Sequence, residues 1–282
     1  MRGTKWSDVM PEIAAHEPLL SMNLISTKLD IEHAIRAYYR AGYGGIGLWY
    51  DQVCDYGVDR TVGLLQEVPI KVTHLVYAGP FNQTSEKDYL AAREDDREKL
   101  LVAARLGADS VLAMTGPLNG LGQNEAFRQL TRSLRELADT AGECGVAIGL
   151  EPLNYIERED SFLFTLSDAM DIIEEIDHPS VGVLIDVYHV WQEPCLMKTL
   201  QRTRDRIVGC HINDFRRENR SYCDRVLMGD GCIPVRNILD ELKRQGWDKW
   251  YDIEIFSDEL WSMEPDAFLG LAREKYDRLW SR

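Results

Sequence analysis

The chain has 282 residues, of which 45% are hydrophobic, and it carries a formal net charge of −15. A chain of this length can fold around one large core, and length alone does not require a second domain. The acidic balance argues against nucleic acid or an anionic membrane as the main partner, because both attract a basic face. We interpret the charge itself as a solubility feature.

The spacing of the cysteines and the lack of long apolar runs indicate in which cellular compartment the protein is expected. The six cysteines form no CxxC pair and show no regular spacing, so neither a disulfide framework nor a cysteine zinc site is expected. The opening segment MRGTKWSDVMPEIAAHEP has no apolar stretch long enough for a signal peptide, and no segment approaches a membrane span. We therefore expect a reduced protein of the cytoplasm.

Strand-like and helix-like segments alternate from one end of the chain to the other. The expected strands are 20–24, 45–49, 70–77, 110–114, 146–150, 181–185, 207–211 and 251–255. Amphipathic segments between them include 30–41, 86–106, 124–144, 166–176 and 234–245. Gly42, Gly107 and Gly246 follow such segments where a C-cap glycine belongs, and Pro234 suits the first position of a helix.

This alternation predicts a parallel sheet with helices outside it. Eight units in this length predict an α/β fold, a closed (β/α)₈ TIM barrel, with a doubly wound open sheet as the alternative. No linker or low-complexity stretch divides the chain, so we expect one domain over 1–282, with 1–20 as a leading arm or extra helix.

Four residues that can bind a metal stand at the ends of short apolar runs in the second half of the chain. They are Glu151 in AIGLEPLN, Asp186 in VGVLIDVYH, His211 in IVGCHIND and Glu254 in YDIEIFS. Runs of this kind are typical of buried parallel strands, and a charge at their end is costly to bury unless it is paired or binds a metal. In a barrel, the carboxyl ends of the strands also carry the active site.

Each of these residues alone has a simpler interpretation, as a helix cap or a satisfied core histidine. Together, on consecutive predicted strands, they indicate one divalent ion. Three carboxylates and one imidazole form a hard site, for which we expect Mn²⁺ first, with Mg²⁺, Co²⁺ or Zn²⁺ as alternatives.

The runs EPLNYIE, DVYH, HINDFRR and EIF resemble the xylose isomerase-like barrels, the sugar isomerase and epimerase superfamily, from about residue 22 onward. The similarity is strongest to ketose 3-epimerases, inosose isomerases and dehydratases, and the large subunits of C-glycoside deglycosidases. The resemblance implies that Glu151, Asp186, His211 and Glu254 are the metal ligands. It also implies, from their offsets, that Glu157, His189 and Arg217 contact substrate hydroxyls. Their alternative roles are a hydrogen bond between His189 and a carboxylate, and solvent exposure of Arg217.

The expected chemistry is removal of a proton next to a carbonyl of a keto-sugar or inosose. Glu151 and Glu254 are the predicted catalytic pair, passing through an enediolate held on the metal to an isomerised or epimerised product. A leaving group β to the carbonyl would make the same protein a lyase, either a dehydratase or a deglycosidase of 3-keto sugars. A DNA-repair endonuclease or a non-catalytic barrel fits less well, because the charge is acidic and all four residues are present. The expected partner is a small carbohydrate, with a homo-oligomer or a small second subunit as further options.

Other features near the predicted mouth are less specific. Trp49 ends the second strand and is a candidate for stacking on a sugar, although it also suits a rim aromatic. Asn23 is a candidate for a substrate hydroxyl, and His74 is interpreted as an interior histidine. The glycines of 120–123 and 228–231 are interpreted as turns, because they lack a P-loop lysine. The long segment 213–232 carries Arg216, Arg217, Arg220 and Arg225, which suit a lid, an anion site or a solvated face.

Overall fold

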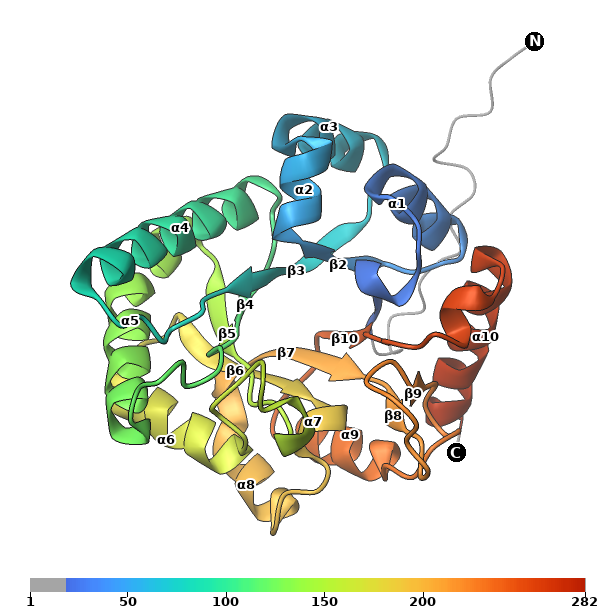
Figure 1. The fold of residues 1–282 in the computed structure, drawn as a ribbon. Coiled ribbons are helices and arrows are strands. Elements are labelled where there is room, and N and C mark those ends of the chain that lie inside the picture. Colours follow the sequence, from blue (N-terminus) through green and yellow to red (C-terminus); the bar gives the residue numbers. More distant parts are fainter. Residues whose placement is uncertain (1–18, 282) are drawn as a thin grey trace.

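The computed structural model describes residues 19–281, and in this part the strands form one closed parallel barrel (Figure 1). Around the barrel the strand order is β1-β10-β7-β6-β5-β4-β3-β2. The strands are β1 (Leu19–Asn23), β2 (Gly45–Trp49), β3 (Lys71–Ala78), β4 (Ser110–Ala113), β5 (Ala147–Leu150), β6 (Val181–Asp186), β7 (Ile207–Ile212) and β10 (Trp250–Ile253). The predicted single-domain TIM barrel is confirmed. The leading arm predicted for 1–20 lies outside the described residues, except that Leu19 and Leu20 begin β1.

Helices cover the outside of this barrel, except that the short α7 (Val187–Val190) directly follows β6 at the barrel mouth (Figure 1). They are α1 (Ile31–Arg40), α2 (Tyr50–Tyr56), α3 (Val58–Glu67), α4 (Glu86–Arg105), α5 (Gln123–Cys144), α6 (Leu166–Ile176), α7 (Val187–Val190), α8 (Leu196–Thr203), α9 (Val235–Arg244) and α10 (Pro265–Trp280). Short 3₁₀ turns are η2 (Leu24–Ser26), η3 (Tyr155–Glu157), η4 (Arg204–Arg206) and η5 (Leu260–Ser262). A small antiparallel pair, β8 (Asp214–Phe215) with β9 (Arg225–Val226), follows β7.

Local sequence signals account for many of the helix ends. Asp30, Ser85 and Thr165 accept a backbone hydrogen bond at the N-termini of α1, α4 and α6. The predicted C-cap glycines 42, 107 and 246 have φ values of +84°, +67° and +95°, which favour glycine. Pro234 precedes α9 as its N-cap instead of occupying the first helical position.

The barrel strands are buried on both faces, as their apolar sequences predict. This core leaves the carboxyl ends of the strands and the segments that follow them to carry polar chemistry. Within residues 19–281, no helix is both long and apolar enough to cross a membrane. All six cysteines are free.

Candidate metal centre

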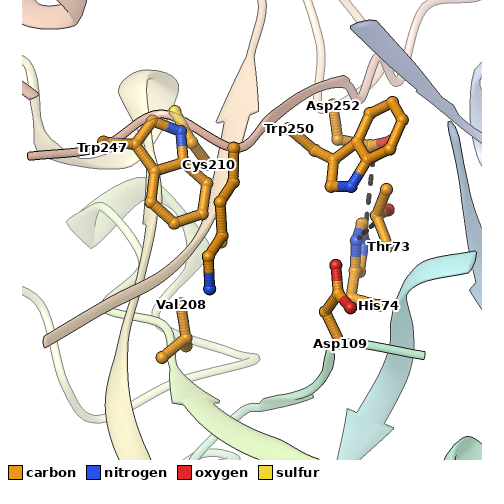
Figure 2. A pocket seen from close by; sticks show the side chains of 10 residues that line it. Thr73, His74, Asp109, Val208, Cys210, Trp247, Trp250 and Asp252 are labelled. Atoms are coloured by element: carbon orange, nitrogen blue, oxygen red, sulfur yellow. Dashed lines mark hydrogen bonds and ion pairs between the residues drawn. The ribbon is translucent and has the colours of Figure 1, made fainter. Parts of the chain in front are cut away.

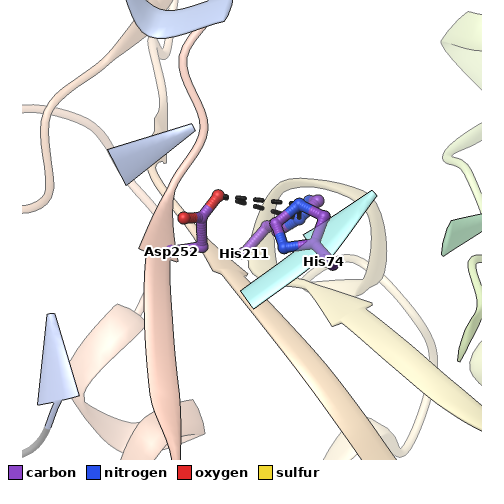
Figure 3. A group of neighbouring side chains, drawn as sticks. All are labelled: His74, His211 and Asp252. Atoms are coloured by element: carbon purple, nitrogen blue, oxygen red, sulfur yellow. Dashed lines mark hydrogen bonds and ion pairs between the residues drawn. The ribbon is translucent and has the colours of Figure 1, made fainter. Parts of the chain in front are cut away.

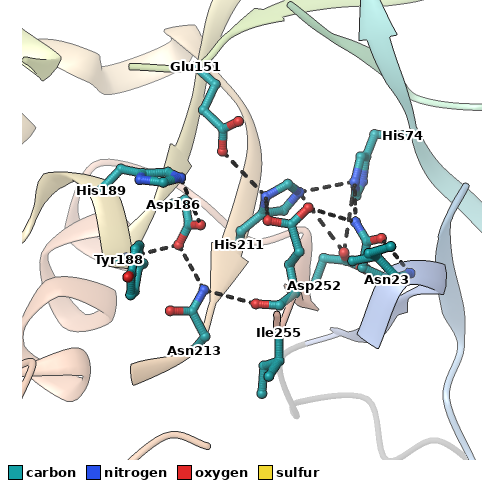
Figure 4. A network of polar contacts seen from close by, with 12 residues as sticks. Asn23, His74, Glu151, Asp186, Tyr188, His189, His211, Asn213, Asp252 and Ile255 are labelled. Carbon is teal, nitrogen blue, oxygen red and sulfur yellow. Dashed lines mark hydrogen bonds and ion pairs between the residues drawn. The ribbon is translucent and has the colours of Figure 1, made fainter. Parts of the chain in front are cut away.

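Glu151, Asp186 and His211 converge at the carboxyl end of the barrel (Figure 4), and Glu254 lies within 3.4 Å of His211. Glu151 directly follows β5 and Glu254 directly follows β10, while Asp186 is the last residue of β6. His211 lies in β7, in register with Asp186 on the neighbouring strand. All four side chains are buried.

Two carboxylates approach the same nitrogen of the His211 imidazole. Its Nδ1 is 3.4 Å from Glu151 Oε1 and 3.4 Å from Glu254 Oε2. Ligand atoms of Glu151, Asp186 and His211 all lie within 4.8 Å of one another. This spacing suits oxygen and nitrogen ligands that share one ion.

A cation fits this donor set because two of its buried ligand atoms make no hydrogen bond and are held only at ion-pair distances of 3.4 Å. Glu151 Oε1 and His211 Nδ1 are buried and have no hydrogen-bond partner, which is costly for polar atoms. Burial raises the pKa of the Glu151 carboxyl to about 7, with the charges of Glu254 and Asp186 adding to the effect and His211 opposing it. The residues that would hold the ion are Glu151, Asp186, His211 and Glu254.

Neighbouring groups fix two of these carboxylates. Asp186 Oδ1 accepts hydrogen bonds from the Tyr188 backbone N–H at 2.9 Å and from Asn213 Nδ2 at 3.0 Å. Asn213 Nδ2 also donates to the backbone carbonyl of Glu254 at 3.0 Å, and Asn23 Nδ2 donates to Glu254 Oε1 at 3.2 Å. The strands that supply ligands are therefore tied together around the site.

The guanidinium that enters the site belongs to Arg225, the first residue of β9. Its Nη1 donates to Asp186 Oδ2 at 3.0 Å and to Glu254 Oε2 at 3.3 Å. Its Nη2 donates to Glu157 Oε1 at 3.4 Å. Arg225 is 2% exposed and lies between the rings of Tyr188 and Phe256, whose centroids are 4.2 and 4.8 Å away.

Arg217, which the family offsets assigned to substrate, is exposed and is not brought into this group. The difference arises from the β8–β9 pairing, which sets Arg225 opposite Phe215 and turns the intervening segment outward. Arg216 and Arg220 instead hold Asp224 and Glu259, at distances that include 3.0 Å from Arg216 Nε to Asp224 Oδ1. The arginine-rich segment therefore serves two purposes, closing a surface loop and supplying one buried cation.

Glu157 and His189 lie beside the four candidate ligands. His189 Nδ1 accepts the backbone N–H of Asn154 at 3.2 Å, so in the neutral ring Nε2 carries the proton. This Nε2 is 3.6 Å from Asp186 Oδ2 and 3.9 Å from Glu157 Oε2. Burial raises the pKa of Glu157 to about 7, against the opposing charge of Arg225.

Residues from the first strands complete the surroundings. Trp49 is half-buried, and its Nε1 donates to Asn23 Oδ1 at 2.8 Å. Its ring meets that of Phe256 edge-on, with centroids 6.3 Å apart. His74 lies inside β3, as predicted, but its Nε2 is 3.0 Å from His211 Nε2. No local sequence pattern indicates that contact beyond the inward direction shared by alternate strand residues.

The glycine turns do not form a phosphate cradle. Asp214 accepts backbone hydrogen bonds from Gly229, Gly231 and Ile233 at 2.8–3.0 Å, so the N–H groups of this loop already have a partner. A Cβ atom on Gly231 would lie 2.3 Å from Asp214 Oδ1, which explains the glycine. In the other turn, Gly120 has a φ of +80° and Gly122 is the N-cap of α5.

Known proteins are similar to this chain in sequence and in fold. Inosose isomerase of Bacillus velezensis is 24% identical over 82% of this chain and 85% of its own length. D-psicose 3-epimerase of Enterocloster bolteae is 30% identical over 40% of this chain and 34% of its own length. A crystal structure of a Sinorhizobium meliloti protein matches with a TM-score of 0.88 and 30% identity, over 92% of this chain and 98% of that one.

A further solved structure is described as an IOLI protein with a bound zinc atom. It matches with a TM-score of 0.84 and 21% identity, over 93% of this chain and 98% of that one, and so shows the fold. The model of the xylose isomerase-like TIM barrel family matches residues 35–276, which is most of the chain. The chain therefore belongs to the xylose isomerase-like TIM barrel family.

Proposed function

We propose that this protein is a divalent-metal-dependent sugar isomerase or epimerase. It removes a proton from the carbon next to a carbonyl of a keto-sugar or an inosose. The observation that carries the proposal is the buried cluster of Glu151, Asp186, His211 and Glu254, in which Glu151 Oε1 and His211 Nδ1 have no hydrogen-bond partner. The relatives named as an inosose isomerase and a D-psicose 3-epimerase support this class of substrate.

The ligand set favours Mn²⁺, with Mg²⁺, Co²⁺ and Zn²⁺ as alternatives, because carboxylate-rich sites suit hard cations. When bound, such an ion polarises a carbonyl and makes the neighbouring C–H more acidic. The zinc atom described for one related structure supports keeping Zn²⁺ among the alternatives.

Two carboxylates divide the proton transfers. Glu254 is held at both oxygens, by Asn23 at 3.2 Å and by Arg225 at 3.3 Å, whereas Glu151 Oε1 has no hydrogen bond. Glu151 is thus the less constrained of the two carboxylates and the proposed base. Glu254, which directly follows β10, reaches the same His211 Nδ1 at 3.4 Å and is the second carboxylate, the one that returns a proton.

The neighbours of the cluster suit a ligand rich in hydroxyl groups. Arg225 and the Nε2–H of His189 are donors, while the carboxylate of Glu157 is an acceptor. Trp49 offers an aromatic face at the rim of the same end. We propose that Arg225 takes the substrate-facing role that the family offsets gave to Arg217.

The experiment is an exchange assay in D₂O followed by NMR. Purified protein loaded with Mn²⁺ is incubated with free ketoses, inososes and 3-keto glycosides, and the metal content is measured. Deuterium should enter at a carbon next to the carbonyl of one substrate class. Glu151→Gln and Glu254→Gln should each abolish the exchange. Glu143→Gln, an exposed glutamate of α5, is the matched control and should leave it unchanged.

Product analysis separates the proposed reaction from its alternative. An isomerised or epimerised sugar supports the proposal. An eliminated product with the same deuterium uptake makes the protein a lyase that starts with the same proton removal. Absence of bound metal, or absence of exchange with every carbonyl substrate, contradicts the proposal. A homo-oligomer or a small second subunit remains a prediction that the same preparation tests by its mass in solution.

A further inference from the structure

We propose that His74 is a positioning residue that fixes the orientation and tautomer of His211 by accepting a hydrogen bond from His211 Nε2. The Nδ1 lone pair of His211 then faces Glu151 and Glu254. This inference rests on the proposed metal-dependent function, because it assigns a support to one of the proposed ligands. It concerns a residue that touches neither the substrate nor the ion.

The contact between the two rings is direct. His74 Nε2 and His211 Nε2 are 3.0 Å apart, the ring centroids are 4.7 Å apart, and the planes are inclined by 46° (Figure 3). Both side chains are buried. Two imidazole nitrogens at this distance share one proton, so one is the donor and the other the acceptor.

The surroundings of His74 decide the direction of this bond. Its Nδ1 is 3.0 Å from Thr73 Oγ1, and that hydroxyl donates to the backbone carbonyl of Ile46 at 3.2 Å. The hydroxyl can therefore give its proton to that carbonyl and accept from His74 Nδ1–H, and the orientation of the Asn23 amide selects this arrangement. A neutral His74 with its proton on Nδ1 has only a lone pair at Nε2.

The hydrogen bonds of Asn23 also indicate that His74 Nε2 is an acceptor. Its Nδ2 is 3.2 Å from His74 Nε2, while its Oδ1 accepts from Trp49 Nε1 at 2.8 Å. The tryptophan N–H can only donate, so the amide orientation of Asn23 is fixed and its NH₂ group faces His74. The single lone pair of His74 Nε2 is thus shared between the N–H groups of Asn23 Nδ2 and His211 Nε2. His211 carries its proton on Nε2, which leaves the Nδ1 lone pair for the ion.

The barrel makes room for this arrangement at Gly47. Gly47 is in register with Asn23 on β1 and with His74 on β3. A Cβ atom there would lie 2.5 Å from His74 Cε1 and 2.9 Å from Asn23 Nδ2. Only a glycine at this position lets the two side chains meet without a shift.

A carboxylate is the usual acceptor behind a metal-binding histidine, and Asp252 lies nearby. Its Oδ2 is 4.0 Å from His211 Nε2 and 3.8 Å from His74 Nε2, beyond hydrogen-bond distance, and its Oδ1 accepts from Ser21. Asp252 and His74 also line a cavity of about 10 Å³ toward the amino ends of the strands, with Cys210 and Trp247 (Figure 2). Asp252 therefore belongs to the residues nearer the amino ends of the strands. The imidazole of His74 is the acceptor for His211 Nε2.

His74, His211 and Asp252 also lie close enough together to be considered as a metal site, with ligand atoms within 4.8 Å. The hydrogen-bond directions oppose that assignment, because His211 Nε2 points a proton, not a lone pair, at this group. We therefore infer one ion per chain, on the Nδ1 side of His211.

The test compares His74→Phe with His74→Gln. Phenylalanine removes the acceptor, whereas the amide of glutamine extends to about the place of Nε2 and can accept again. Apoprotein is titrated with Mn²⁺ in the absence of substrate, and the Co²⁺ form is examined by visible absorption. His74→Phe should weaken metal affinity by about 10- to 100-fold, as loss of such a support does, and should change the Co²⁺ spectrum. His74→Gln should restore both.

Three results would overturn the inference. Metal affinity could be unchanged in His74→Phe, Asp252→Asn could cause the larger loss, or the wild type could bind two ions of which His74→Phe loses one. ¹⁵N NMR of the histidine rings in metal-free protein at alkaline pH reads the tautomer separately. A proton on His211 Nε2 that is lost from that position in His74→Phe supports the role of His74 even if the enzyme proposal fails. A neutral His211 ring with its one proton on Nδ1 in the wild type contradicts it.

Discussion

The two halves of the barrel end in different chemistry. The strands β5, β6, β7 and β10 end in or beside the ionisable residues Glu151, Asp186, His211 and Glu254, whereas β1 to β4 end in Asn23, Trp49, Ala78 and Ala113. The ionisable half gathers negative charge around one point. In the neutral half, the amide of Asn23, the indole of Trp49 and the imidazole of His74 form hydrogen bonds without adding charge. The comparison separates the residues that hold an ion from those that orient them.

The largest effect should come from the ionisable half. Glu151→Gln keeps the size of the side chain but removes the base, so we expect the deuterium exchange rate to fall by about 10³-fold, within the range for loss of a general base. Single-turnover exchange measured by NMR checks this. A fall of less than about tenfold would mean that another group takes the proton.

Substitution of Arg225 tests how much the stability of the acidic cluster depends on this buried guanidinium. Arg225→Met leaves Asp186, Glu254 and Glu157 without that partner, so the free energy of unfolding in a chelator should fall by about 3 kcal/mol. Arg217→Met, at the exposed position, is the matched control and should stay within about 0.5 kcal/mol. Urea unfolding measures both, and equal effects would show that Arg217 also supports the site.

Protons should compete with the ion in the ionisable half. Burial raises the pKa of Glu151 to about 7, so this carboxyl is protonated below that pH and the metal must displace the proton. Metal affinity should therefore rise as the pH increases from about 6 to about 8, by up to tenfold per unit for each proton displaced. Isothermal titration at several pH values checks the slope, and Glu151→Gln should make it shallower. A slope of zero in the wild type would contradict the expectation.

The smallest effect should come from the rim of the neutral half. Trp49→Phe keeps an aromatic ring but removes the N–H that donates to Asn23 Oδ1 at 2.8 Å. Loss of one such bond costs about 1 kcal/mol, so we expect a change of several-fold in KM and little change in the exchange rate constant at saturation. Steady-state kinetics separate the two. A large fall in kcat alone would place Trp49 closer to the reacting atoms than the structure indicates.

The barrel and the convergence of four strand-end residues could be predicted from sequence, because both depend on short-range patterns. Apolar runs identify the strands, and parallel strands bring their carboxyl ends to one edge. The entry of Arg225 could not be predicted, since it depends on the pairing of Phe215 with Arg225 across a surface loop. An offset counted along the chain cannot reveal which arginine such a loop turns inward.

The contact between His74 and His211 was also beyond the sequence alone. The two residues are 137 positions apart, and their strands are not neighbours in the barrel. They meet because alternate residues point into the barrel and Gly47 leaves space between β1 and β3. Such a contact depends on the closure of the sheet, which no local pattern records.

Metal titration of the wild type and of Asp186→Asn tests the central claim most directly. Asp186 is fully buried and is the only one of the four candidate ligands whose side chain caps the following helix, so the asparagine keeps the cap acceptor while removing one negative ligand. The account predicts one Mn²⁺ per wild-type chain and a loss of affinity of at least about tenfold in the variant, comparable to or larger than the loss of a supporting group. Wild-type affinity in Asp186→Asn would contradict it.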